Sequence, residues 1–180
     1  MFLTCAQTRL AVLVEALDIA TQSTRSVAHT VDAVAATLQP FLGLPDLLIS
    51  AQQAGDPAGY GQRLLHVSAD GAYSLVALVW LPGQSTPVHD HVAWCVVGVH
   101  EGEECEIRYR QRGGQLVEDE SLVSPRGSVA GLVPPGDIHR VSNDGDRLAI
   151  SLHVYGADLR HRGTSIHRRY DAPLVAPLPG

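Results

Sequence analysis

Residues 83–102 constrain this chain more than any other stretch, because a glycine and proline turn there leads into His89-Asp90-His91. Side chains on an extended strand face the same way at every second position, so the two imidazoles should lie side by side. A second segment, residues 134–143, carries His139 behind a Pro/Gly turn that can bring a third imidazole in from a neighbouring strand. We therefore expect a metal site between the two segments.

The remainder of the chain predicts a mainly β fold. Short runs rich in β-branched residues follow one another from residue 62 onward, separated by turn residues. Strands at this spacing are typical of a small barrel or sandwich. We expect strands at residues 63–68, 73–81, 87–91, 93–100, 105–110, 116–123, 128–133, 139–142 and 148–155.

Two helices are expected before these strands. Apolar residues recur at helical spacing over residues 8–21 and again over 26–38, where Pro40 ends the pattern. Both helices should pack against the outside of the sheet. A chain of 180 residues suits one domain with a sizeable core. We divide it into a helical segment (1–45), a core with the metal site (60–156) and an Arg-rich tail (157–180) whose Pro-rich end is loosely held.

Charge and cysteine usage exclude several classes of function. The net charge is -6 and the charges are mixed along the chain, so nothing suggests a nucleic-acid surface. Glu15 and Asp18 interrupt the N-terminal apolar run, which argues against a signal peptide and against a membrane span. Three cysteines without a pairing motif favour a reducing compartment. We expect a soluble, cytoplasmic protein.

Three histidines with no obvious fourth ligand leave coordination positions open for a substrate. Without a carboxylate ligand the site keeps the full charge of a divalent cation and should favour an anion such as a thiolate. Three imidazoles do not by themselves choose among iron, zinc, manganese and nickel.

Both segments resemble the paired motifs of the cupin superfamily. The first motif is Gly, five residues, His-x-His, three or four residues, Glu, six residues, Gly, and the second is Pro-x-Gly-x-x-His-x-x-x-Asn. Cys95 stands where the motif has Glu. The resemblance implies a single cupin domain, a small β-barrel of the jelly-roll type, with the two N-terminal helices packed outside. The matching residues are Gly83, His89, His91 and Gly102 in the first motif and Pro134, Gly136, His139 and Asn143 in the second.

Ser151, His153 and Tyr155 alternate on a predicted strand, so they share one face and can form a hydrogen-bond relay. Together with residues 60–65 and Trp80, this pattern resembles the thiol dioxygenases, a family that contains cysteine dioxygenase and the bacterial 3-mercaptopropionate dioxygenases. The resemblance implies an Fe(2+) cofactor bound by His89, His91 and His139. It implies a small thiol that binds through its thiolate, and O2, whose two oxygen atoms pass to sulfur to give a sulfinate. Tyr155, held by His153 and Ser151, would be the catalytic hydroxyl.

The resemblance leaves the thiol open between 3-mercaptopropionate and cysteine. Cysteine dioxygenases of the mammalian type bind the substrate carboxylate with an Arg two residues after a Tyr. Alignment on Tyr60 puts Gln62 there, the form associated with 3-mercaptopropionate, whereas counting back from Trp80 puts Arg63 there. We favour Gln62. The 3-mercaptopropionate enzymes supply the carboxylate-binding Arg after the Ser–His–Tyr strand, where spacing does not choose among Arg160, Arg162, Arg168 and Arg169.

In the mammalian enzyme a Cys in this region is bonded to the active-site Tyr as a thioether. The resemblance therefore implies that Cys95 lies near Tyr155 and is a candidate for such a crosslink. The acids Glu103 and Glu104 are expected in a turn, with solvated or structural roles.

Two other functions stay open at this point. One is a non-catalytic cupin that binds a metal and a small ligand as a sensor. The other is a zinc or manganese isomerase or hydrolase, with Asp90 or Asp137 as its only nearby carboxylates. Cupins are often homodimers, but no interface can be read from the sequence.

Overall fold

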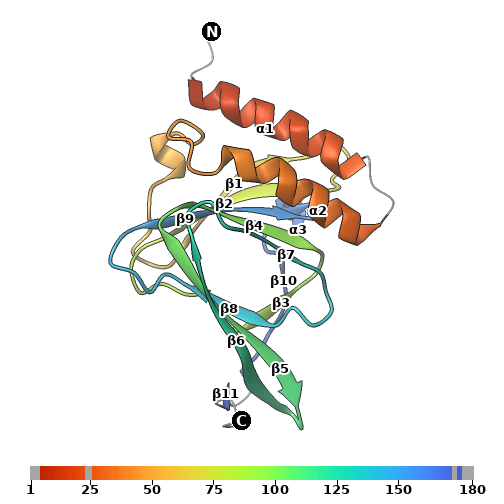
Figure 1. Cartoon of the computed structure of the whole chain (residues 1–180), viewed down its shortest axis with the longest axis vertical. Coiled ribbons are helices and arrows are strands. Elements are labelled where there is room, and N and C mark those ends of the chain that lie inside the picture. Colours follow the sequence, from red (N-terminus) through yellow and green to blue (C-terminus); the bar gives the residue numbers. More distant parts are fainter. Residues whose placement is uncertain (1–4, 23–25, 172–173, 176–180) are drawn as a thin grey trace.

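Two β-sheets face each other in the computed structural model, which describes residues 5–22, 26–171 and 174–175 (Figure 1). The first sheet has, in order, β1 (Gly61–Val67), β2 (Ser74–Trp80), β9 (Ala149–Tyr155), β4 (Cys95–Glu101) and β7 (Val129–Leu132). The second has β10 (Ile166–Arg169), β3 (His89–His91), β8 (His139–Ser142), β5 (Glu103–Arg112), β6 (Gln115–Pro125) and β11 (Leu174–Val175). Apart from the parallel β6–β11 contact, the described pairings are antiparallel. The predicted mainly β fold of the cupin type is confirmed.

Strands β2 and β9 lie at the centre of the first sheet, and all seven residues of each are buried. Alternation gives each strand two different faces. Leu75, Leu152 and the other residues of one face join a core beneath the helices. Trp80 and Tyr155 belong to the opposite face, in a second cluster between the sheets. Ser151 and His153 lie an even number of residues before Tyr155 on the same strand, so all three side chains are on one face. The relay residues therefore point into the interior rather than into solvent.

Helices α1 (Cys5–Gln22) and α2 (Val27–Leu38) cover the outer face of the first sheet, as predicted (Figure 1). Ser26 caps α2 by accepting a hydrogen bond from the backbone N–H of His29. The helix approaches β7 so closely that a Cβ added at Gly131 would clash with Val31. Close packing of α2 on the sheet therefore needs glycine at position 131.

The C-terminal segment contains more regular secondary structure than the sequence predicted. The tail, for which we expected no helix or strand, forms α3 (Leu159–Arg162), then β10, which pairs with the histidine strand β3, and then the short β11. All three elements are short, and α3 and β10 are rich in Arg, so they lack the apolar periodicity that marks the other strands. Most of the Pro-rich end that we expected to be loosely held, residues 172–173 and 176–180, lies outside the described residues.

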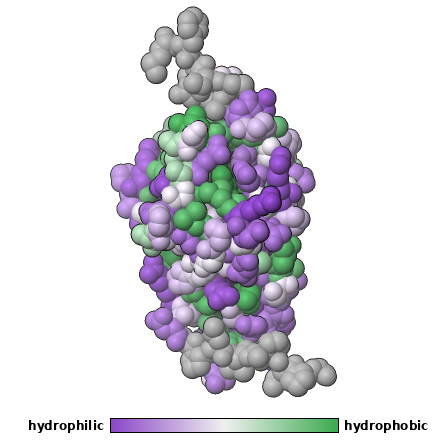
Figure 2. Space-filling view, turned by 90° about the vertical axis from the view of Figure 1, so that its left-hand side faces the viewer, coloured by the Kyte–Doolittle hydropathy of each residue, from purple (hydrophilic) through white to green (hydrophobic). Residues whose placement is uncertain are grey.

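Polar and apolar side chains are interspersed over the face shown in Figure 2. Two of the exposed large apolar residues, Val12 and Ile19, lie on α1, and the others, such as Leu64 and Val123, belong to different parts of the chain. Single exposed apolar side chains are normal for a folded protein. None of the described helices is both long enough and apolar enough to cross a membrane.

Candidate metal centre

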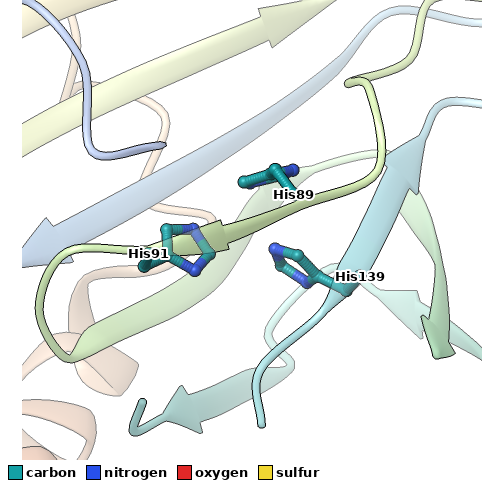
Figure 3. A group of neighbouring side chains, drawn as sticks. All are labelled: His89, His91 and His139. Carbon is teal, nitrogen blue, oxygen red and sulfur yellow. The ribbon is translucent and has the colours of Figure 1, made fainter. Parts of the chain in front are cut away.

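His89, His91 and His139 converge on the space between β3 and β8 (Figure 3). His89 and His91 are two residues apart on β3, and His139 lies directly opposite His89 on β8. One nitrogen of each ring lies within 4.8 Å of those of the other two, and all three residues are buried. The strand alternation from which we predicted the site also explains its geometry, because it directs all three side chains to the interior.

Each imidazole is held through its Nδ1. That of His89 lies 2.9 Å from the carbonyl oxygen of Pro87, and that of His91 lies 2.9 Å from Asp137 Oδ2. His139 Nδ1 lies 2.7 Å from Glu106 Oε1. Acceptors at Nδ1 place the proton there and leave the Nε2 lone pair free for a metal.

The ring nitrogens fit a metal ion in two further ways. His139 Nε2 is buried without a hydrogen-bond partner, a state that costs free energy unless a ligand occupies it. Burial, with the neighbouring imidazoles His139 and His91, lowers the pKa of His89 to about 3, and burial also lowers the pKa of His139. Neutral imidazoles are the form that binds metals.

Ser151, His153 and Tyr155 form a continuous hydrogen-bonded chain inside the protein. His153 Nε2 lies 2.8 Å from Ser151 Oγ, and its Nδ1 lies 2.9 Å from the Tyr155 hydroxyl. Trp80 Nε1 donates to Ser151 Oγ at 3.2 Å. Burial holds the pKa of His153 well below its ordinary value and that of Tyr155 well above it, so both rings are neutral. The chain ends beside the metal centre, where the Tyr155 ring lies 5.9 Å from that of His91.

Cys95 lies directly opposite Tyr155 on the neighbouring strand β4. Its side chain is fully buried, and its Sγ lies 3.9 Å from His153 Nδ1. Burial raises the pKa of the Cys95 thiol well above its usual value, so the group is a neutral thiol. The sulfur therefore belongs to the same buried cluster as the relay.

A small pocket opens onto the metal centre. Gln62 lines it, and its Nε2 donates to the Gly163 carbonyl at 3.4 Å. Arg63, the alternative from the sequence, points to the other side of β1, where Nη2 donates to the Ala54 carbonyl at 3.0 Å. Neighbouring residues on a strand face opposite ways, so only one of the two can line the pocket. The described lining residues are Tyr60, Gln62, Leu78, Trp80, Thr86, His89, His91, His139, Val141, His153, Tyr155, Thr164, Ser165 and Ile166.

The pairing of β10 with β3 puts Arg168 and Arg169 on different faces. A bulge between Ile166 and Arg168 shifts the β10–β3 register, so Ile166 pairs with His91, Arg168 with Asp90 and Arg169 with His89. Directly opposite residues of an antiparallel pair lie on the same face. Arg169 is therefore on the face of the metal ligands. A strictly alternating strand would have put Arg168 there, and bulges re-aim side chains in this way.

Contacts agree with this register. Arg168 Nη2 lies 3.5 Å from Asp90 Oδ2, on the face away from the metal, where the Tyr170 hydroxyl also donates to Asp90. The positive charge of Arg169 partly offsets the burial that raises the pKa of Tyr60, a residue of the pocket wall. Of the other candidates, Arg160 pairs with Asp158, and Arg162 is exposed on α3 outside the described lining of the pocket.

The sequence analysis missed the acidic residues that support the site. Glu106 and Asp137 hold two of the histidines, so Asp137 is already engaged and is not free to act as a base. Burial alone would raise the pKa of both carboxyls, but the hydrogen bonds from His139 and His91, respectively, bring it below the ordinary value. Glu104 was expected in a turn but is buried on β5. The available signal was the i, i+2 spacing of Glu104 and Glu106, which puts both on one strand face.

This chain is similar to one family model and to several proteins of known structure. A family model described as cysteine dioxygenase type I matches residues 15–169, a stretch that includes the three histidines and the relay. The TT1209 protein of Thermus thermophilus is 23% identical over 64% of this chain and 98% of that chain, with a TM-score of 0.47. An RmlC-like cupin protein from Desulfovibrio desulfuricans is 24% identical over 57% of this chain and 88% of that one, with a TM-score of 0.44. An RmlC-like cupin family protein with a double-stranded β-helix fold from Methanocaldococcus jannaschii is 12% identical over 61% and 90%, with a TM-score of 0.44.

Proposed function

Since this chain belongs to the family of type I cysteine dioxygenases, which are non-haem iron thiol dioxygenases, we propose that it oxidises 3-mercaptopropionate, in preference to cysteine, to the sulfinate. The proposed cofactor is Fe(II), held by His89, His91 and His139. Bound there, iron supplies the redox chemistry between the thiol and dioxygen, and the protein supplies position and polarity.

The single observation that carries the preference for this thiol is the position of Gln62 on the pocket wall, with Arg63 turned away. Arg63 on that wall would favour the mammalian type of carboxylate binding, whereas Gln62 is the form that resembles the 3-mercaptopropionate enzymes. The carboxylate would then pair with a cation of the C-terminal segment. Arg169, on the metal-ligand face of β10, is our candidate for that role.

A second feature of the pocket also supports a thiol without an amine. The described residues that line it include no Asp or Glu. The ammonium group of cysteine would have to leave water for a site without a compensating carboxylate, which is costly. 3-Mercaptopropionate has no such group.

The other residues of the pocket have different roles in the proposed reaction. Thr164, Ser165 and Ile166 line the pocket beside the metal centre. Tyr155 presents a neutral hydroxyl at the same place, oriented by His153 and Ser151. A neutral phenol donates a hydrogen bond to charge that develops on oxygen during the reaction.

The test is oxygen uptake by anaerobically iron-loaded protein with 3-mercaptopropionate, cysteine and cysteamine in parallel, with the sulfinate quantified. We expect uptake matched by sulfinate, with the largest kcat/KM for 3-mercaptopropionate. A larger kcat/KM for cysteine would contradict the proposed substrate and leave the class of reaction intact. No uptake with any thiol, despite bound iron, would contradict the proposed reaction.

A binding module without turnover is the weaker alternative. Such a module has no use for a buried chain of polar side chains, which costs free energy unless every member is satisfied. Here each member of the Ser151–His153–Tyr155 chain has a partner.

A further inference from the structure

Asp90 lies between two metal ligands on β3, and strand alternation turns its side chain to the opposite face. It is only 8% exposed. The proposed reaction does not use this carboxylate, and a buried charge is costly unless other groups pair with it. Its described partners all belong to the C-terminal segment. The role of Asp90 therefore concerns that segment.

Three side chains of the C-terminal segment converge on Asp90. The Tyr170 hydroxyl donates to Oδ2 at 2.7 Å, and Arg168 Nη2 lies 3.5 Å from the same oxygen. His167 Nδ1 lies 3.4 Å from Oδ1. The Arg168 guanidinium also lies over the Tyr170 ring, 5.3 Å from its centroid. One carboxylate thus gathers three of the four residues from 167 to 170.

These contacts lie at and beyond the bulge in β10. Ile166 pairs with His91, and the next paired residue is Arg168, opposite Asp90, so His167 is the extra residue of the bulge. A bulge moves every later residue of its strand by one position relative to the partner strand. Because side chains alternate, that one position decides which later side chains face the metal and which face away.

Asp90 meets different side chains in the two registers that β10 can adopt. With the bulge, Arg168 and Tyr170 lie on the same face as Asp90, and the next paragraph of the strand, Arg169, faces the metal ligands. Without it, Arg168 would lie opposite His89 instead, and Tyr170 would turn to the metal face. Asp90 would then lose its hydroxyl donor and its arginine. Backbone pairing alone does not favour the bulge, since a bulge leaves one residue unpaired.

We propose that Asp90 is a positioning residue: by binding Tyr170 and Arg168 on the outer face, it holds β10 in the register that presents Arg169 to the substrate carboxylate. The inference rests on the proposed function for its effect on the substrate, whereas the register is a property of the folded protein alone. Asp90 itself does not touch the substrate. It determines which of two adjacent arginines does.

The first test observes the register without turnover. The full chain, uniformly labelled with ¹³C and ¹⁵N and loaded with diamagnetic Zn(II), is examined by NMR for proton contacts between β10 and β3. In wild type we expect contacts of His89 with Arg169. In Asp90→Ala, contacts of His89 with Arg168 should replace them.

The matched control is Asp18→Ala, which removes another carboxylate that accepts a tyrosine hydroxyl, that of Tyr73 at 2.9 Å. Neither residue of this pair belongs to the described lining of the thiol pocket, so the variant should keep the wild-type contacts. If Asp90→Ala does not fold, Tyr170→Phe takes its place, because it keeps the ring and removes only the hydroxyl. Tyr170→Phe should show both sets of contacts.

The second test measures KM for 3-mercaptopropionate in single and double variants with matched iron content. In the wild-type background, Arg169→Ala should raise KM by about 10- to 100-fold and Arg168→Ala by several times less, because the Tyr170 hydroxyl still binds Asp90. In the Asp90→Ala background the two effects should exchange. Cysteamine, which has no carboxylate, should not distinguish the arginine variants in either background.

Wild-type contacts of His89 that persist in Asp90→Ala, or in Tyr170→Phe where that variant replaces it, would overturn the inference. Loss of both sets of contacts would overturn it equally, since Asp90 would then hold the strand in place without choosing its register. Failure of the proposed function looks different: no variant would form sulfinate, or cysteine would be preferred, while the NMR contacts still followed Asp90.

Discussion

Cys95 and Tyr155 are directly opposite each other on β4 and β9, and both side chains are buried. We predict that turnover joins them by a thioether. A C–S bond would form with loss of the thiol hydrogen and one ring hydrogen, and O2, a substrate of the enzyme, would accept the two electrons. The intact mass should fall by two hydrogen atoms, with the change mapped to the linked peptides. Cys95→Ala should show no change. Unmodified peptides after many turnovers would rule the bond out.

Metal affinity should depend on Glu106, because its carboxylate holds the Nδ1 proton of His139. We predict that Glu106→Gln weakens iron binding by about 10- to 100-fold, measured by competition with a chelator. The matched control is Glu120→Gln, which removes an exposed carboxylate that pairs with the same Arg108. Equal affinities in the two variants would contradict a supporting role for Glu106.

Metal binding should stabilise the fold, since the three histidines belong to two strands that the ion would tie together. At a free metal concentration about 100 times Kd, linkage predicts about 2.7 kcal/mol, or about 5–10 °C in Tm. His139→Ala should lose most of this increase in a thermal melt. His161→Ala, an exposed histidine of α3, should keep it. An increase that survives in His139→Ala would place the ion elsewhere.

We expect the substrate carboxylate to pair with Arg169 rather than with Arg168. We predict that Arg169→Ala raises KM for 3-mercaptopropionate by about 10- to 100-fold, because a charge-assisted hydrogen bond is lost. Cysteamine, which has no carboxylate, should be oxidised equally by wild type and variant. Arg160→Ala, which removes an exposed partner of Asp158, serves as the control. A larger effect of Arg168→Ala would mean that the bulge in β10 does not set the specificity.

Packing of α2 on β7 should be sensitive to position 131. Gly131→Ala would force its new methyl group against Val31, and we predict a loss of about 1–3 kcal/mol in the free energy of unfolding, measured with urea. Gly59→Ala, where nothing lies within 4 Å of the new Cβ, should stay within about 0.5 kcal/mol of wild type. In a double-mutant cycle, Val31→Ala should relieve part of the cost. Additive effects would show that the two residues do not meet.

The sequence alone determined the strands up to residue 155, both helices and the three histidines. These depend on local rules: strand alternation, helical periodicity, and turns made by Gly and Pro. The rule that placed His89 and His91 on one face also aligned Ser151, His153 and Tyr155. Strong short-range patterns of this kind can be recognised in the sequence before any contact between distant segments is known.

The tertiary structure decided which distant groups meet. Glu104 was expected in a turn and Glu106 was only one residue of a predicted strand, and it is the tertiary structure that buries Glu104 and brings Glu106 to His139. Arg168 and Arg169 are equivalent by spacing until a bulge in the pairing of β10 with β3 turns one toward Asp90 and the other toward the metal. Register between segments some 80 residues apart depends on long-range pairing, and one extra residue in a strand exchanges its two faces.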